Sequence, residues 1–237
     1  MTLVDGARYE LRRFGAGQPP DVRDISNLHA ALLPDSPVTR LGASFREKFY
    51  YKDLPELGHV FGVVAYVEGR AAGFVAATHD SDGFMRSALR QRGPRITWAI
   101  ASALLGDLRR IRAVWEAARI HLDRNQLAGR GAGAERGPMG EILSLGVLPQ
   151  FRDAAFRSRS GLHIGRDLAG CVMETFRTHG ATKVRVIVDD DNRHAQRFYD
   201  KLGWRRNRRG LPGWRCPSDE FIWEPAQGRS AQVHSIF

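Results

Sequence analysis

One strand–turn–helix segment in the C-terminal half limits the possible folds most. The apolar run Ile142 to Leu148 has strand length, and after a turn containing Arg and Gly the residues Leu162 to His179 have helical periodicity. The first N–H groups of such a helix have no intrahelical partner and lie at the positive end of the helix dipole. The segment therefore predicts an α/β fold whose turn can receive a pyrophosphate, although a turn of this composition is more often only a connection.

The N-terminal half predicts a strand, two helices and a hairpin. Period-two alternation favours a strand at Tyr9 to Phe14, and helical spacing follows at Asp21 to Leu33 and again at Leu41 to Tyr50. Two runs rich in β-branched and aromatic residues, Val60 to Val67 and Ala72 to Thr78, are separated by a Glu-Gly pair that can form a hairpin turn. The expected order is β-α-α-β-β.

Residues 79–140 interrupt this pattern. A helix is expected to begin near Pro94 and to run toward Leu122, followed by a Gly-rich connector. The basic polar face of this helix could lie on a membrane surface, but a helix packed on its own domain with a solvated basic face is commoner. We expect a single domain over residues 1–237, with 79–140 as a helical insertion and 226–237 as a C-terminal tail.

Charge and cysteine content limit the ligands. The formal charge of +10 favours anionic ligands and disfavours polyamines, aminoglycosides and Lys-rich tails unless a local acidic patch receives them. Cys171 and Cys216 lie far apart without metal-ligand spacing, so neither a disulfide nor a metal site is expected. Charged residues at Asp5, Arg8 and Glu10 interrupt any apolar leader, and we therefore expect a cytoplasmic protein.

A second motif makes a family resemblance specific. The sequence from Val186 to Trp204 reads VIVDDDNRHAQRFYDKLGW. A strand ending in Val, followed by Asn, Ala, Phe-Tyr, Lys-Leu-Gly and an aromatic residue, resembles the C-terminal acetyl-CoA-binding motif of the GNAT acetyltransferases. The Val-Leu-Pro at 147–149, with Gly161 and Gly165, resembles their preceding motif at the expected separation.

This resemblance implies the fold and the coenzyme site. The GNAT fold has a central mixed, mostly antiparallel sheet with helices on both faces. Here it would splay between its fourth strand, Ile142 to Leu148, and its fifth, Lys183 to Val188, and carry the helical insertion between strands three and four. Acetyl-CoA would lie in the splay as cosubstrate, without a metal. The implied coenzyme-binding residues are Leu145, Val147, Arg159, Gly161, Leu162, His163, Ile164, Gly165 and Asn192.

Two catalytic residues are implied in the same way. Tyr199 matches the tyrosine that lies near the thioester sulfur in the family, and a phenol that is protonated at neutral pH can protonate the departing thiolate. Glu141 is placed like the general base of the histone-acetylating branch, and a solvated strand-end carboxylate is an equally good interpretation. Strict alternation would put Glu141, Leu145 and Val147 on one face of the strand if no bulge intervenes.

The motif also departs from the family. Ser160 and His163 stand at the first position and the first glycine of the usual Arg/Gln-x-x-Gly-x-Gly/Ala pattern, and the loop before them is longer. Arg159 can substitute for the first position by a shift of one residue. These departures leave a non-catalytic acyl-CoA-binding module as the alternative of a different class.

The acceptor expected is a small-molecule primary amine. Residues 32–51 faintly resemble family members that accompany polysaccharide biosynthesis, which with the basic charge makes an amino-sugar nucleotide the first choice and a protein or peptide amine the second. The arginines at 205, 206, 208 and 209 suggest a solvated hairpin or a coenzyme contact more than a nucleic-acid site. Neither nucleic acid nor a membrane surface is expected as a partner, and a homodimer stays open.

Overall fold

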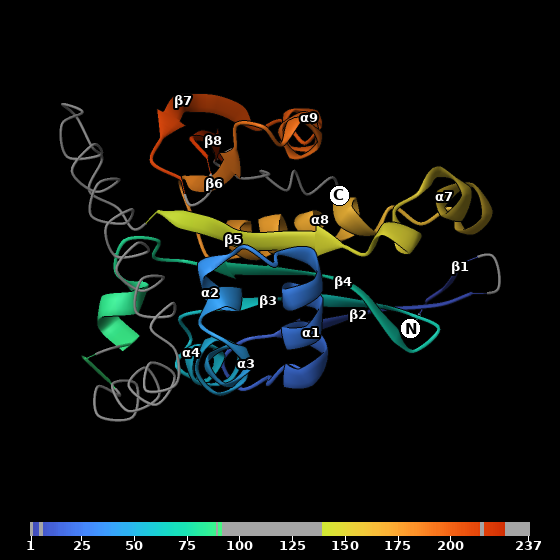
Figure 1. Ribbon diagram of the computed structural model, residues 1–237, viewed down its shortest axis with the longest axis horizontal. Helices are drawn as coiled ribbons and strands as arrows, with labels where there is room; N and C mark the ends of the chain where they lie inside the picture. Colours follow the sequence, from blue (N-terminus) through green and yellow to red (C-terminus); the bar gives the residue numbers. More distant parts are fainter. Residues whose placement is uncertain (1, 5–6, 89, 92–138, 214–215, 226–237) are drawn as a thin grey trace, which may run out of the picture.

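The computed structural model describes residues 2–4, 7–88, 90–91, 139–213 and 216–225 (Figure 1). These residues form an eight-stranded sheet in the order β1-β2-β3-β4-β5-β6-β8-β7. All neighbouring strands are antiparallel except β5 and β6, which confirms the predicted mostly antiparallel mixed sheet. The strands are β1 (Thr2–Val4), β2 (Ala7–Phe14), β3 (Phe61–Val67), β4 (Arg70–Thr78), β5 (Gly140–Val147), β6 (Val184–Asp189), β7 (Arg205–Leu211) and β8 (Ser218–Trp223).

The N-terminal strands agree with the predicted pattern and add one element. The β3–β4 hairpin turns at Glu68 and Gly69, whose φ angles are 51° and 73°. Two consecutive left-handed residues match the right-handed twist of a hairpin, so the Glu-Gly pair forms the predicted turn. Strand β1 pairs with β2 and was not predicted, because three residues are too few to show alternation.

Short helices cover one face of the sheet. Helix α1 (Val22–Leu32) is capped by the Asp21 side chain and lies across β4 and β5 (Figure 1). In place of the second predicted helix, Leu41 to Tyr50, the chain forms α3 (Ala43–Phe45) and the π-helix η1 (Arg46–Asp53). Two short helices that were not predicted flank them, α2 (Pro37–Arg40) and α4 (Leu54–Glu56). Gly42, with a φ of 95°, separates α2 from α3. The wider π turns put Phe49, Tyr50 and Tyr51 inside this layer together.

Helices α8 (Ile164–Thr178) and α9 (Arg193–Lys201) cover the opposite face. Helix α8 packs on β3, β4 and β5, and its buried residues Leu168, Val172 and Phe176 recur every four positions. Helix α9 is capped by Asn192 and contacts β7. The sheet thus separates two apolar clusters, one under α1 and η1 and one under α8 and α9. Helices on both faces were predicted and are confirmed.

Part of the predicted organisation cannot be compared with the structure. Most of the expected insertion, and all of the expected tail at 226–237, lie outside the described residues. Within the described part of the chain, no helix is both long and apolar enough to cross a bilayer.

A buried polar network lies inside the α1 layer. The His29 side chain is 1% exposed, its Nδ1 bonds the Tyr51 hydroxyl, and its Nε2 lies 2.9 Å from the Ser36 hydroxyl. Burial, with Arg46 nearby, lowers the pKa of His29 to about 3. Between about pH 6.5 and pH 3 the imidazole is therefore neutral in the folded protein, whereas it is protonated in the unfolded chain.

This lowered pKa predicts a loss of stability in weak acid. The unfolded state takes up a proton near pH 6.5 and the folded state does not, so the stabilisation is complete above pH 6.5 and falls as pH decreases toward 3. From pH 6.5 to 5 the free energy of unfolding should decrease by about 2 kcal/mol through this residue. Urea unfolding of wild type and His29→Gln at pH 6.5 and pH 5 measures this change in the free energy of unfolding. The control is His194→Gln, on the exposed surface of α9, which should keep the wild-type pH dependence. An equal pH dependence in wild type and His29→Gln would contradict the assignment.

Candidate active site

The sheet opens between its two parallel strands. Strands β5 and β6 pair at only three positions, Gly140 with Val184, Glu141 with Arg185 and Ile142 with Val186. Beyond Ile142 the strands diverge, while β5 continues to Val147 along β4. The edge of β5 that faces β6 therefore has no strand partner from Leu143 to Val147 within the described residues. The predicted splay is confirmed, and its open edge offers backbone N–H and C=O groups to an extended ligand.

A short helix that the sequence did not predict lies at the wide end of this opening. After the 3₁₀ turn η2 (Pro149–Phe151), residues 154–160 form α7 (Ala154–Ser160), whose N-terminus is capped by the Asp153 carboxylate. Arg159 lies in this helix with an exposed side chain. The longer loop before Gly161 is thus partly helical. The sequence indicates only a turn for these arginines, because seven residues show little helical periodicity.

In the turn between α7 and α8, some backbone N–H groups donate a hydrogen bond within the protein and others do not. Gly161 ends α7 with a φ of 65°, and its N–H donates to the Arg157 carbonyl at 2.9 Å. The Leu162 N–H donates to the Ser160 hydroxyl at 3.2 Å. The N–H groups of Ile164 and Gly165, in the first turn of α8, have no hydrogen-bond partner among the described residues. These two free N–H groups make the start of α8, directly after the exposed His163, a place where an anion can bind.

Three elements converge at Gly165. A Cβ atom added there would lie 3.6 Å from the Phe198 ring on α9 and 3.9 Å from Val147 on β5. The start of α8, the end of β5 and the inner side of α9 therefore border the same space. The structure brings together Val147, Gly165 and Phe198 of the C-terminal motif, which are separated by up to 51 positions in the sequence.

A bulge in β5 changes which side chains share a face. Ala76 pairs with Ser144 and Ala77 with Ile142, so Leu143 is an extra residue in β5. Leu145 and Val147 pack in the cluster under α8, whereas Leu143 packs in the cluster under α1. Strict alternation would put Glu141 with Leu145 and Val147 only if no bulge intervened. The bulge reverses the parity, so Glu141 lies on the other face of the sheet.

Tyr199 is buried in the cluster under α9. Its side chain is 4% exposed and packs edge-on against Trp204, with ring centroids 5.3 Å apart. Burial raises the pKa of Tyr199, so the phenol keeps its proton at neutral pH. No hydrogen bond joins its hydroxyl to any described residue. Asn192 caps α9 by accepting a bond from the Ala195 N–H at 3.1 Å, so its side chain has a structural role as well as a place near the site.

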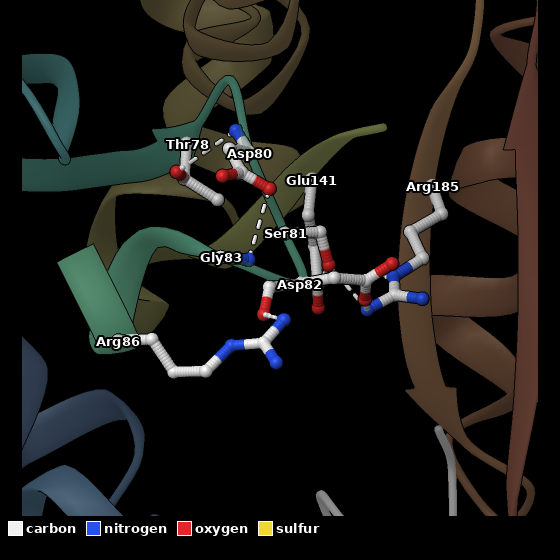
Figure 2. A network of polar contacts seen from close by, with 8 residues as sticks. All are labelled: Thr78, Asp80, Ser81, Asp82, Gly83, Arg86, Glu141 and Arg185. Atoms are coloured by element: carbon white, nitrogen blue, oxygen red, sulfur yellow. Dashed lines mark hydrogen bonds and ion pairs between the residues drawn. The ribbon is translucent and has the colours of Figure 1, made fainter. Parts of the chain in front are cut away.

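Glu141 belongs to a network of polar contacts at the narrow end of the splay (Figure 2). Its carboxylate accepts a bond from Arg185 Nε at 2.9 Å and another from the Ser81 hydroxyl. Arg185 also bonds the Ser81 hydroxyl and pairs with Asp82 at 3.1 Å. Burial alone would lower the pKa of Arg185, but Glu141 and Asp82 together raise it. Glu141 also adds to the raised pKa of Tyr50, caused mainly by burial, so its charge acts on the η1 side of the sheet.

Sequence reasoning missed the partners of Glu141. Arg185 is a single charged residue inside the apolar strand 184–188, a signal of a paired buried charge, but which carboxylate it meets depends on strand register. Ser81 and Asp82 follow β4 by only a few residues and reach β6 because β4 and β5 are neighbours.

A mixed sheet that opens between parallel strands, with free helix amides at the opening, offers hydrogen-bonding groups of a strand edge and a helix start side by side. Comparison with known proteins agrees. The model of the acetyltransferase (GNAT) family matches residues 25–204, and the chain belongs to this family. The predicted family, fold and acetyltransferase class are thereby confirmed.

Solved structures with the same fold include acetyltransferases of different kinds. Arabidopsis thaliana NAA60 in complex with acetyl-CoA is 15% identical over 92% of this chain and 98% of its own, with a TM-score of 0.53. An agmatine N-acetyltransferase in its apo form is 18% identical over 92% and 100%, with a TM-score of 0.52. A putative GNAT acetyltransferase from Desulfovibrio desulfuricans is 14% identical over 92% and 98%, with a TM-score of 0.51. No curated protein matches the sequence.

Proposed function

We propose that this protein transfers the acetyl group of acetyl-CoA to a primary amine, with the coenzyme lying in the splay between β5 and β6. The single observation that carries the proposal is the open edge of β5 leading to the free amides of α8, in a chain of the acetyltransferase family. An extended chain with a diphosphate at one end fits this combination, because the strand edge bonds its amides and the helix start holds its phosphates.

The proposed contacts follow from these groups. The N–H groups of Ile164 and Gly165 bind the diphosphate, and the neighbouring turn of Gly161, Leu162 and His163 surrounds it. Arg159 on α7 adds positive charge nearby. The backbone of Leu145 and Val147 bonds the pantetheine arm and polarises the thioester carbonyl. Gly165 contributes its backbone N–H to this site, and a Cβ there would make only ordinary van der Waals contacts with Val147 and Phe198.

The proposed chemistry needs one proton donor from the protein. The neutral amine attacks the thioester carbon, the C–S bond breaks, and Tyr199 protonates the departing thiolate. The proton released from the attacking nitrogen leaves to water, because protonating Glu141 would cost its buried ion pair with Arg185. Tyr199 recovers its proton from solvent after the products leave.

For the acceptor we propose an amino-sugar nucleotide, with a protein or peptide amine as the second candidate. The net charge of +10 supports an acceptor that carries phosphate, since the average field attracts anions. Of the structurally similar proteins, one is named as an agmatine N-acetyltransferase, so the fold accommodates small amines as well.

An acceptor screen that follows thiol release from acetyl-CoA tests the function. We expect turnover with at least one amino-sugar nucleotide and a product that is N-acetylated by mass spectrometry. Binding of coenzyme A without turnover on any amine would favour the non-catalytic module. No binding of coenzyme A or acetyl-CoA would remove the proposal altogether.

A further inference from the structure

The Glu141–Arg185 ion pair lies at the point where the sheet begins to open. The two residues are register partners in the middle of the three-residue β5–β6 pairing, and the strands separate one residue later. Their side chains are 13% and 12% exposed, and Arg185 Nε lies 2.9 Å from the carboxylate. The ion pair therefore bridges the two strands one position before their last pairing, next to the point where they separate.

The same ion pair also contacts the segment that links β4 to β5. The buried Ser81 bonds both charged groups through its hydroxyl, and its N–H donates to the Met139 carbonyl at 2.8 Å. Thr78 and Glu141 are register partners between β4 and β5. Figure 2 shows Ser81, Asp82 and Glu141 lying against Arg185. Ser81 and Asp82, near the start of the 79–140 segment, and Glu141, just after its end, are therefore held to β6 through one set of contacts.

We propose that Glu141, Arg185 and Ser81 form a clamp that sets the opening of the coenzyme splay, and that Glu141 acts in the reaction as a positioning residue of this clamp and not as the general base. The inference rests on the proposed coenzyme site. Arg185 and Ser81 both bond Oε2 of the carboxylate. Accepting a proton at either oxygen would remove the negative charge of Glu141 and leave the buried guanidinium only the half-exposed Asp82 as an ionic partner.

The two roles predict opposite results for a double variant. Removing one partner of a buried ion pair leaves an unpaired charge, whereas replacing both removes that penalty. As a clamp, Glu141→Gln and Arg185→Gln should each lower the unfolding temperature by about 5–10 °C and raise KM for acetyl-CoA about tenfold or more. The double variant Glu141→Gln/Arg185→Gln should recover most of the lost unfolding temperature and most of the lost coenzyme affinity. The two amides that it introduces can bond each other and Ser81.

Activity as a function of pH separates the alternatives. A clamp predicts that all three variants keep the ascending limb of the wild-type pH profile and that the double variant is more active than Glu141→Gln. A general base predicts that the double variant is as inactive as Glu141→Gln and that both lose the ascending limb. This second pattern would overturn the proposal.

Controls keep the test independent of the proposed function. Glu174→Gln removes an exposed ion pair with Arg177 on α8, where both side chains are about half exposed, and should leave unfolding temperature and KM unchanged. If wild type shows no turnover with any amine, the proposed function fails. The clamp is then tested by the unfolding temperatures and by coenzyme A affinity, and a double variant no more stable than either single one would refute it.

Discussion

Replacing Tyr199 with phenylalanine should lower kcat for acetyl transfer by about 10²–10⁴-fold, with little change in coenzyme affinity. The change removes only the hydroxyl that we propose protonates the leaving thiolate. Because burial raises the pKa of Tyr199, no other ionisation state of the residue contributes at neutral pH. Stopped-flow or steady-state thiol release gives kcat, and calorimetry with coenzyme A gives the affinity.

Tyr199→Phe should have little effect on the stability of the folded protein. The Tyr199 hydroxyl has no hydrogen-bond partner among the described residues, so its removal leaves no buried group unsatisfied and should alter the unfolding temperature by no more than about 2 °C. Tyr9→Phe is the matched control. Tyr9 is also buried, in the same cluster, and donates to Asp167 at 3.0 Å, so its loss should reduce stability and leave kcat unchanged. A Tyr199→Phe enzyme with wild-type kcat would show that the proton comes from elsewhere.

Replacing Gly165 with aspartate should reduce the affinity for coenzyme A by at least about 100-fold. The new carboxylate would lie in the first turn of α8, between Val147 and Phe198, where the diphosphate is proposed to bind. A charge repulsion across about 5 Å at an intermediate effective dielectric constant costs about 3 kcal/mol, which corresponds to roughly two decades in affinity. Isothermal titration with coenzyme A measures the change.

The fold should tolerate this change. A Cβ at Gly165 makes only ordinary van der Waals contacts, and an acidic residue in the first helical turn interacts favourably with the helix dipole, by about 0.3–1 kcal/mol. Gly165→Ala, with a Cβ and no charge, should bind coenzyme A within a few fold of wild type. Gly170→Asp adds the same charge to the exposed side of α8, where nothing lies within 4 Å of the new Cβ, and should bind normally. Equal affinity in Gly165→Asp and Gly170→Asp would locate the diphosphate away from the start of α8.

The sequence predicted the elements whose signals are local. The buried stripe of Leu168, Val172 and Phe176 determines α8, and the Glu-Gly pair determines the β3–β4 turn. The coenzyme motif is local in the same sense, because a helix start carries free amides wherever it lies. The sequence alone therefore determined the family, the order of most strands and the place of the free amides.

Tertiary structure decided the features that depend on how neighbouring strands align. The bulge at Leu143 arises from the pairing of β5 with β4, and one extra residue was enough to put Glu141 and Val147 on opposite faces of the sheet. The parallel register of β5 and β6 decided that Glu141 meets Arg185, and the β4–β5 pairing brought Ser81 to both. Periodicity along one strand contains no information on its register with another, because a shift of a single residue exchanges the two faces at no cost in local propensity.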